Sequence, residues 1–188
     1  MRVEAAVLRR SLSGRRCRRT SQVPRGRSPA RSAPGRTTAS LPERAKSGSR
    51  GNGSALVTLD TSAIFALLNR SDPDHKAIRE ALVAALPPYL VPSGILAEIG
   101  YLIERRLGVP VLEAFLLDLE QRAFALVNSE DDLGRVRELV GRYADLPLGL
   151  ADATVIACAE RHGRQVLTLD HRHFGVVARE GKIEMLPT

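Results

Sequence analysis

The 188-residue chain has only two cysteines, Cys17 and Cys158, so a disulfide-stapled fold is excluded. It has no Cys-x-x-Cys pair and no cluster of cysteine with histidine, which argues against a structural zinc site. No apolar run approaches the roughly 18 residues that a membrane-spanning helix needs, so an integral membrane protein is not expected. The low cysteine content agrees with a reducing, cytoplasmic location.

Glycine-rich phosphate-binding motifs are also missing. No Gly-x-Gly-x-x-Gly follows the first predicted strand, and no Gly-x₄-Gly-Lys-[Ser/Thr] occurs anywhere, which excludes dinucleotide-binding and P-loop proteins. A phosphotransferase with an aspartyl nucleophile would need a second aspartate two residues after Asp60, but position 62 is serine. The hydrophobic content of 44% is nevertheless that of an ordinary globular domain.

Positive charge is concentrated at one end of the chain. Residues 1–53 carry 14 Lys/Arg and 2 acids, a net charge of +12, whereas residues 54–188 carry 14 Lys/Arg and 19 acids, a net charge of −5. The overall +7 alone would suggest a nucleic-acid binder, but the whole excess lies in the first segment. The composition therefore predicts a disordered basic tail over residues 1–53 and a separate folded domain over residues 54–188.

Three interpretations of the tail are open: a nucleic-acid-binding arm, an Arg- and Ser-rich transit peptide, or a segment that the native protein lacks. The compositional break at residues 51–54 is abrupt, and the folded pattern begins at once after it. This break favours the third interpretation, with translation starting near Leu56 or Val57.

Short apolar segments alternate with amphipathic ones from residue 55 onward. This alternation predicts a parallel sheet with helices on both faces, an α/β fold of the three-layer α/β/α sandwich type. The expected strands span residues 55–59, 89–91, 124–127, 165–169 and 183–186, and the expected helices residues 61–69, 75–85, 93–106, 111–122, 131–143 and 150–162.

Four carboxylates stand out against this framework. Asp60 and Asp170 each follow a predicted strand directly, at the edge of a parallel sheet where ligands bind. Glu98 and Asp152 have mainly apolar or glycine neighbours three and four residues away, so we expect them on buried helix faces. Asp60 as a helix cap and Asp170 as a turn residue are competing interpretations. Convergence of all four would suit a hard divalent cation, Mg²⁺ or Mn²⁺.

The sequence contains Asp60-Thr61-Ser62 after the first strand, Glu98 within a helix, Gly149-Leu150-Ala151-Asp152-Ala153, and Leu167-Thr168-Leu169-Asp170 followed by Phe174. In this order and spacing, the motifs resemble those of PIN-domain nucleases, and most closely the VapC-type toxins of bacterial toxin–antitoxin pairs. The resemblance covers about residues 56–186. It implies that residues 54–188 form a PIN-like nuclease domain.

The resemblance further implies a Mg²⁺-dependent endoribonuclease in which metal-activated water cleaves RNA, leaving 5′-phosphate and 3′-hydroxyl ends. Asp60 and Asp152 would be the principal metal ligands, and Glu98 and Asp170 would bind directly or through water. Thr61 and Ser62 match the hydroxyl residues that orient a ligand carboxylate, and Thr154 and Thr168 are weaker candidates for the same role. The implied partners are an RNA substrate, a small cognate antitoxin and a second copy of the chain.

Two other functions are open at this stage. His171 and His173 could cleave RNA without metal as an acid and a base, although their spacing is more typical of exposed turn residues above a packed Phe174. A non-catalytic RNA-binding or scaffold protein is the other alternative. A basic rim near the carboxylates could hold phosphate in either case, or could be ordinary solvated helix ends; its candidates are Arg105, Arg106, Arg161, Arg164 and Arg172.

Overall fold

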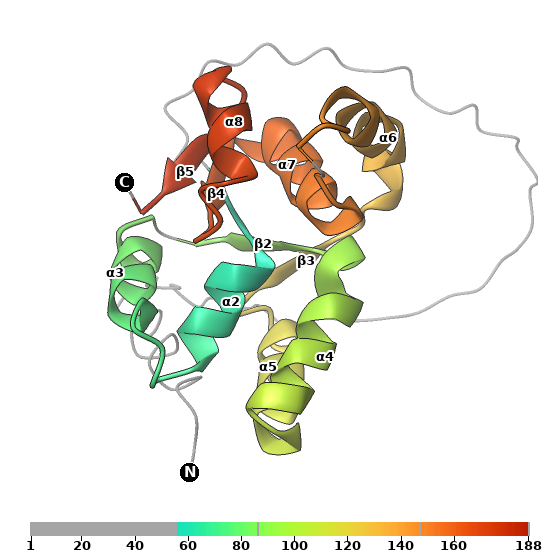
Figure 1. Cartoon of the computed structure of the whole chain (residues 1–188). Helices are drawn as coiled ribbons and strands as arrows, with labels where there is room; N and C mark the ends of the chain where they lie inside the picture. The colour runs from blue at the N-terminus through green and yellow to red at the C-terminus, as the bar shows by residue number, and fades with distance from the viewer. Residues whose placement is uncertain (1–55, 86, 147, 188) are drawn as a thin grey trace, which may run out of the picture. The chain divides into compact units, whose positions relative to one another are not determined.

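Five parallel strands form the central layer of the computed structural model, which describes residues 56–85, 87–146 and 148–187 (Figure 1). Their order across the sheet is β3-β2-β1-β4-β5. The strands are β1 (Val57–Leu59), β2 (Tyr89–Pro92), β3 (Ala125–Val127), β4 (Gln165–Leu167) and β5 (Glu184–Leu186). The predicted parallel sheet is therefore confirmed, whereas the predicted basic tail lies outside the described residues.

The middle strand β1 is buried on both faces, as a central parallel strand requires. Val57 pairs with Tyr89 of β2 on one side and with Gln165 of β4 on the other. The chain thus winds outward from β1 to β3, and then returns to place β4 beside β1. The strand order reverses between β1 and β4, and open α/β sheets bind their ligands beyond the strand ends at such a switch point.

Helices cover both faces of the sheet, in the expected three-layer α/β/α arrangement (Figure 1). The crossovers from β1 to β3 run along one face, and the return crossover to β4 uses the other, as right-handed connections demand. The first face carries α2 (Thr61–Leu68), α3 (His75–Ala85), α4 (Leu96–Arg106) and α5 (Val109–Glu120), and the second α6 (Leu133–Arg142), α7 (Leu150–His162) and α8 (Phe174–Arg179).

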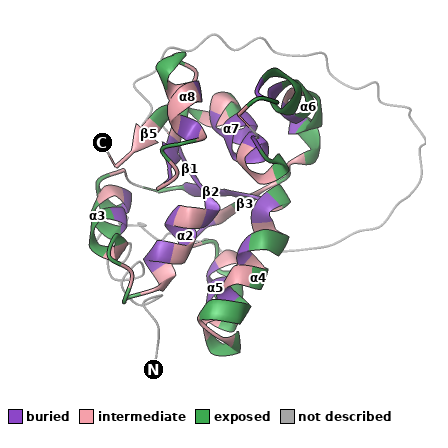
Figure 2. Ribbon diagram, viewed as in Figure 1, coloured by how far each residue is buried: buried purple, intermediate pink, exposed green. Residues whose placement is uncertain are grey.

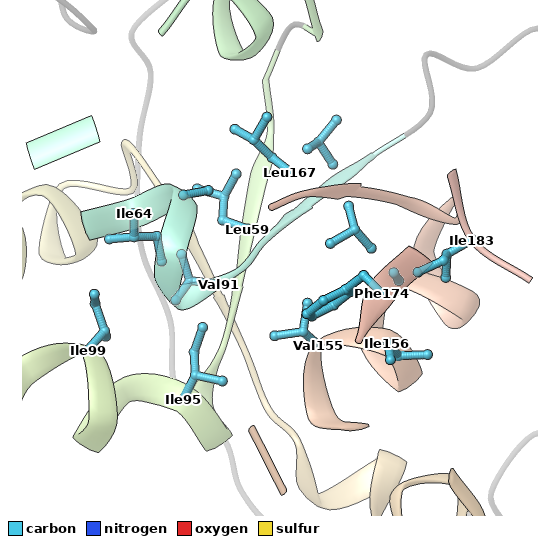
Figure 3. Packing of buried hydrophobic residues seen from close by; sticks show 14 of the residues in the cluster. Leu59, Ile64, Val91, Ile95, Ile99, Val155, Ile156, Leu167, Phe174 and Ile183 are labelled. Atoms are coloured by element: carbon cyan, nitrogen blue, oxygen red, sulfur yellow. The ribbon is translucent and has the colours of Figure 1, made fainter. Parts of the chain in front are cut away.

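The core lies on both sides of the sheet. Ile64 and Ile99 pack on one side, while Val155, Ile156 and Phe174 pack on the other (Figure 3). Buried residues gather on the strands and on the helix surfaces that face them (Figure 2). Among the described residues, no helix combines the length and apolar character that crossing a bilayer requires.

Two details depart from the sequence prediction. Gly108, Val109 and Pro110 were expected to separate two helices; Gly108 does so, with a φ of 91°, but α5 already begins at Val109. Proline is accepted in a first helical turn, because the amide that it lacks has no helical partner there. The short helix α8 was not predicted at all, and it follows directly after Asp170 and the turn at residues 171–173.

Candidate active site

Asp60 is buried, with 4% of its surface exposed, and is the N-cap of helix α2. Its Oδ2 atom accepts three hydrogen bonds: from the Ser62 backbone N–H (3.2 Å), the Ser62 hydroxyl (2.6 Å) and the Thr168 hydroxyl (2.9 Å). The capping interpretation of Asp60 therefore holds at one oxygen. A cap and a metal ligand are compatible roles, because a carboxylate has a second oxygen to offer.

Two hydroxyl groups join the carboxyl ends of β1 and β4. The Thr168 hydroxyl, which is fully buried, donates to Asp60 and accepts from the Asp170 backbone N–H at 3.0 Å. The Ser62 hydroxyl likewise accepts from the Leu169 backbone N–H at 3.0 Å. These bonds fix Asp60 relative to the segment that carries Asp170, so the first and last motifs of the sequence form one rigid unit.

Asp170 organises the turn before α8. Its Oδ1 atom accepts from the backbone N–H groups of Arg172 and His173, both at 3.0 Å. Its Oδ2 atom lies 2.8 Å from the Nδ1 atom of His173. The predicted role of Asp170 as a turn residue is thus filled by its Oδ1 atom, while its Oδ2 atom contacts the His173 ring.

Asp152 lies in the first turn of α7, half-buried, where its Oδ2 atom accepts from the Gly149 backbone N–H at 3.3 Å. The same oxygen is 3.2 Å from His173 Nδ1. Burial raises the pKa of Asp152; the Gly149 N–H opposes this change, and the negative charge of Asp60 adds to it. The expectation of a buried helix face is confirmed for Asp152, because its helical neighbours Val155 and Ile156 are fully buried while Asp152 itself is half-buried.

Glu98 lies in the first turn of α4 and is exposed rather than buried. Its predicted apolar face also fails at Tyr101, which is 61% exposed. The pKa of Glu98 is nevertheless raised, first by partial loss of water contact and then by the charges of Asp60 and Asp152. Glu98 therefore lies close enough to these acids to be affected by their charges, as convergence of the motifs requires.

The donor set fits a divalent cation. One oxygen of Asp152, one oxygen of Asp170 and a ring nitrogen of His173 all lie within 4.8 Å of one another. Burial, and after it the charges of neighbouring carboxylates, raises the pKa values of Asp152 and Glu98, and a bound cation would favour their ionised forms. Oxygen-rich donors at this spacing suit Mg²⁺ and Mn²⁺.

The profile of the PIN domain matches residues 57–180. The chain belongs to the PIN-domain family. It is 34% identical over 123 residues to Ribonuclease VapC26 of Mycobacterium tuberculosis, a match that covers 64% of this chain and 91% of the relative. The chain is therefore a PIN-domain protein of the VapC type, as the sequence motifs predicted.

Two solved structures share the fold. VapC20 of Mycobacterium tuberculosis, a sarcin–ricin loop cleaving toxin, superposes with a TM-score of 0.57 at 23% identity, covering 64% of this chain and 94% of that one. FitAcB from Neisseria gonorrhoeae superposes with a TM-score of 0.51 at 18% identity, covering 69% of this chain and 95% of that one. At these identities, the two structures support the fold.

The two histidines of the turn before α8, His171 and His173, lie in different environments. His171 is exposed, whereas His173 is half-buried, with its Nδ1 atom directed at Asp152 and Asp170. The expectation that both are exposed turn residues is wrong for His173, although Phe174 is fully buried as expected. Because the exposed His171 and the half-buried His173 face different surroundings, the arrangement does not favour an acid–base pair.

Two of the five arginines in the predicted basic rim, Arg161 and Arg164, bind other parts of the fold. Arg161 forms a two-pronged ion pair with the buried Asp132, with Nε–Oδ1 and Nη2–Oδ2 distances of 2.9 and 3.0 Å. Arg164 donates to the Lys182 carbonyl at 2.8 Å. Arg161 therefore serves the fold rather than phosphate binding, whereas Arg105, Arg106 and Arg172 remain exposed.

The hydroxyl residues also differ from their sequence ranking. Ser62 contacts Asp60, whereas the Thr61 hydroxyl is buried without a hydrogen-bond partner among the described residues. Thr168, ranked low from the sequence, makes the second side-chain contact to Asp60, and Thr154 instead donates to the Leu150 carbonyl at 2.7 Å. The signal available in the sequence was the position of Thr168 near the end of a predicted strand. That position alone could not reveal that its hydroxyl contacts Asp60.

Proposed function

We propose that this PIN domain is a Mg²⁺-dependent endoribonuclease, able to use Mn²⁺, that acts as the toxin of a toxin–antitoxin pair. The observation that carries the proposal is a group of acids near the β1/β4 switch point. Asp60 follows β1, carboxylate oxygens of Asp152 and Asp170 lie within 4.8 Å of each other, and the charges of Asp60 and Asp152 contribute to the raised pKa of Glu98. Carboxylates crowded in this way are costly without a cation and are typical of functional sites.

In this proposal, Asp60 and Asp152 are the principal metal ligands, and Asp170 and Glu98 bind directly or through water. Ser62 and Thr168 hold Oδ2 of Asp60, which leaves Oδ1 of that residue to face the ion. The bound ion would supply a water of lowered pKa and offset charge on the phosphate during in-line displacement. The products would carry 5′-phosphate and 3′-hydroxyl ends.

The toxin assignment draws on the 34% identity to Ribonuclease VapC26, which extends over 91% of that protein. From the same resemblance, the proposed partners are a cognate antitoxin, RNA and a second copy of the chain. We also propose that residues 54–188 are the nuclease domain, because the PIN profile begins at residue 57 and both strand-end motifs lie after residue 54.

The test is cleavage of bacterial RNA by the full chain with Mg²⁺, with Mg²⁺ plus a chelator, and with the variants Asp60→Asn and Asp152→Asn. Asp145→Asn is the matched control, because it removes one negative charge from an exposed residue outside the proposed ligand set. We expect chelator-sensitive cleavage by the wild type and the control, and near-complete loss in both site variants. Cleavage by a folded Asp152→Asn protein, or cleavage that survives the chelator, would contradict the proposal.

Growth of a bacterial host discriminates a toxin from a scaffold. Induction of the full chain should arrest growth, whereas induction of Asp152→Asn at the same protein level should not. Equal growth of the two strains would favour a non-catalytic PIN protein.

A further inference from the structure

His173 lies between two of the proposed metal ligands. Its Nδ1 atom is 2.8 Å from Asp170 Oδ2 and 3.2 Å from Asp152 Oδ2. Two anchors hold the residue in place: its backbone N–H donates to Asp170 Oδ1, and the next residue, Phe174, is fully buried in the core (Figure 3). The direction of the imidazole is therefore set by the fold rather than by a freely rotating turn.

The two distances from His173 Nδ1 to the carboxylate oxygens are those of neighbouring ligands on one metal ion, and all three donor atoms lie within 4.8 Å of one another. Ligand atoms about 2.1 Å from an octahedral ion, at right angles to each other, lie about 3.0 Å apart. The observed separations of 2.8 and 3.2 Å bracket this value. A neutral imidazole with its proton on Nε2 presents a lone pair at Nδ1, so the ring can donate to a metal from this position.

We propose that His173 is a metal ligand through Nδ1, together with Asp152 and Asp170, and that this nitrogen makes the site prefer Mn²⁺ over Mg²⁺. The inference rests on the proposed function, because it concerns the same cation. Imidazole nitrogen binds first-row transition ions well, whereas Mg²⁺ favours an all-oxygen shell. A ligand set that contains both nitrogen and oxygen therefore favours Mn²⁺ over Mg²⁺ more strongly than a set of four carboxylates would.

A purely structural role for His173 is the competing explanation, in which Nδ1–H only donates to Asp170. The variant His173→Asn separates the two roles, because an asparagine amide can occupy the Nδ1 position as a donor but offers no imidazole nitrogen. His171→Asn is the matched control, since it removes the neighbouring exposed imidazole of the same turn.

The experiment is electron paramagnetic resonance of Mn²⁺ bound to the full chain, with electron spin-echo modulation to detect a coordinated ¹⁴N nucleus. We expect ¹⁴N coupling in the wild type and in His171→Asn, and its loss in His173→Asn. Competition between the two ions should show a wild-type preference for Mn²⁺ that falls about tenfold in His173→Asn, with a smaller change in Mg²⁺ affinity.

Bound Mn²⁺ without ¹⁴N coupling in the wild type would overturn the inference, even if metal-dependent RNA cleavage persists and the proposed function stands. Coupling that survives in His173→Asn, or an unchanged preference between the ions, would also overturn it. Failure of the wild type to bind Mn²⁺ at all, together with cleavage insensitive to chelator, would overturn both proposals.

Discussion

Replacement of Thr168 by valine tests how the fold holds the proposed metal ligands. Threonine and valine have nearly the same shape, so the change removes one hydroxyl from a fully buried position without opening a cavity. That hydroxyl donates to Asp60 Oδ2 and accepts from the Asp170 N–H. The substitution therefore loosens two of the four acids at once.

The expected cost follows from these two bonds. A hydrogen bond to a charged group contributes about 1.5–3 kcal/mol, and a buried N–H left without a partner costs about 1–3 kcal/mol. Asp60 keeps two bonds from Ser62, so the carboxylate remains partly held. Loss of such an orienting partner lowers metal affinity about 10–100-fold, which corresponds to about 1.4–2.7 kcal/mol and matches the value of one charged hydrogen bond.

The assay is titration of Mn²⁺ into the metal-free full chain, combined with chemical unfolding. The matched control is Thr58→Val, since Thr58 is equally buried on β1 but its hydroxyl bonds only weakly to the Cys158 sulfur at 4.0 Å. We expect weaker Mn²⁺ binding and reduced RNA cleavage in Thr168→Val, and wild-type Mn²⁺ binding in Thr58→Val. Wild-type Mn²⁺ affinity in a folded Thr168→Val protein would refute the reasoning.

Further predictions concern charge. The pKa values of Asp152 and Glu98 are raised in the folded state, so their ionised forms destabilise the metal-free protein at high pH. At pH 8 the metal-free wild type should therefore melt at a lower temperature than metal-free Asp152→Asn. This difference should shrink as the pH falls through the raised pKa of Asp152, because the wild-type carboxylate then becomes protonated. Saturating Mg²⁺ should stabilise the wild type but stabilise Asp152→Asn much less, and an equal shift in both would contradict the site. Arg161→Ala should cost about 1–3 kcal/mol of unfolding free energy, because the buried Asp132 carboxylate loses a guanidinium partner whose side chain is itself 35% exposed. Adding Asp132→Ala should restore part of this loss, and unchanged stability of Arg161→Ala would contradict the pairing.

The fold was predictable because its strands are short, apolar and separated by helices. The sequence also placed Asp60 and Asp170 at one sheet edge; Asp60 follows β1 directly, whereas β4 ends at Leu167, three residues before Asp170. It could not show that β4 lies beside β1, which brings Thr168 within 2.9 Å of Asp60. That neighbour relation depends on the order in which strands pack, and local pattern does not encode it.

The helical acids were harder to place, for a physical reason. Helical periodicity shows which residues share a face of the helix, but it does not show whether that face is buried. Glu98 shares a face with Tyr101, yet both are exposed, because α4 packs on the core through the face that carries Ile99 and Ile103. His173 was misplaced because α8 has only six residues, too few to show a periodic pattern, and the burial of Phe174 fixes its orientation.

The acids at the site divide into two kinds, and this division bears on what a cation would do. Oδ2 of Asp60 accepts three hydrogen bonds, so this buried carboxylate is stabilised by the fold itself. Asp152 and Glu98 instead carry raised pKa values and rely on fewer compensating contacts. A divalent ion would therefore favour the ionised forms of Asp152 and Glu98, while the hydrogen bonds to Asp60 hold that ligand in position. On this argument, the net charge of −5 on residues 54–188 is no obstacle to RNA binding, because the bound cation rather than surface basicity would face the phosphate.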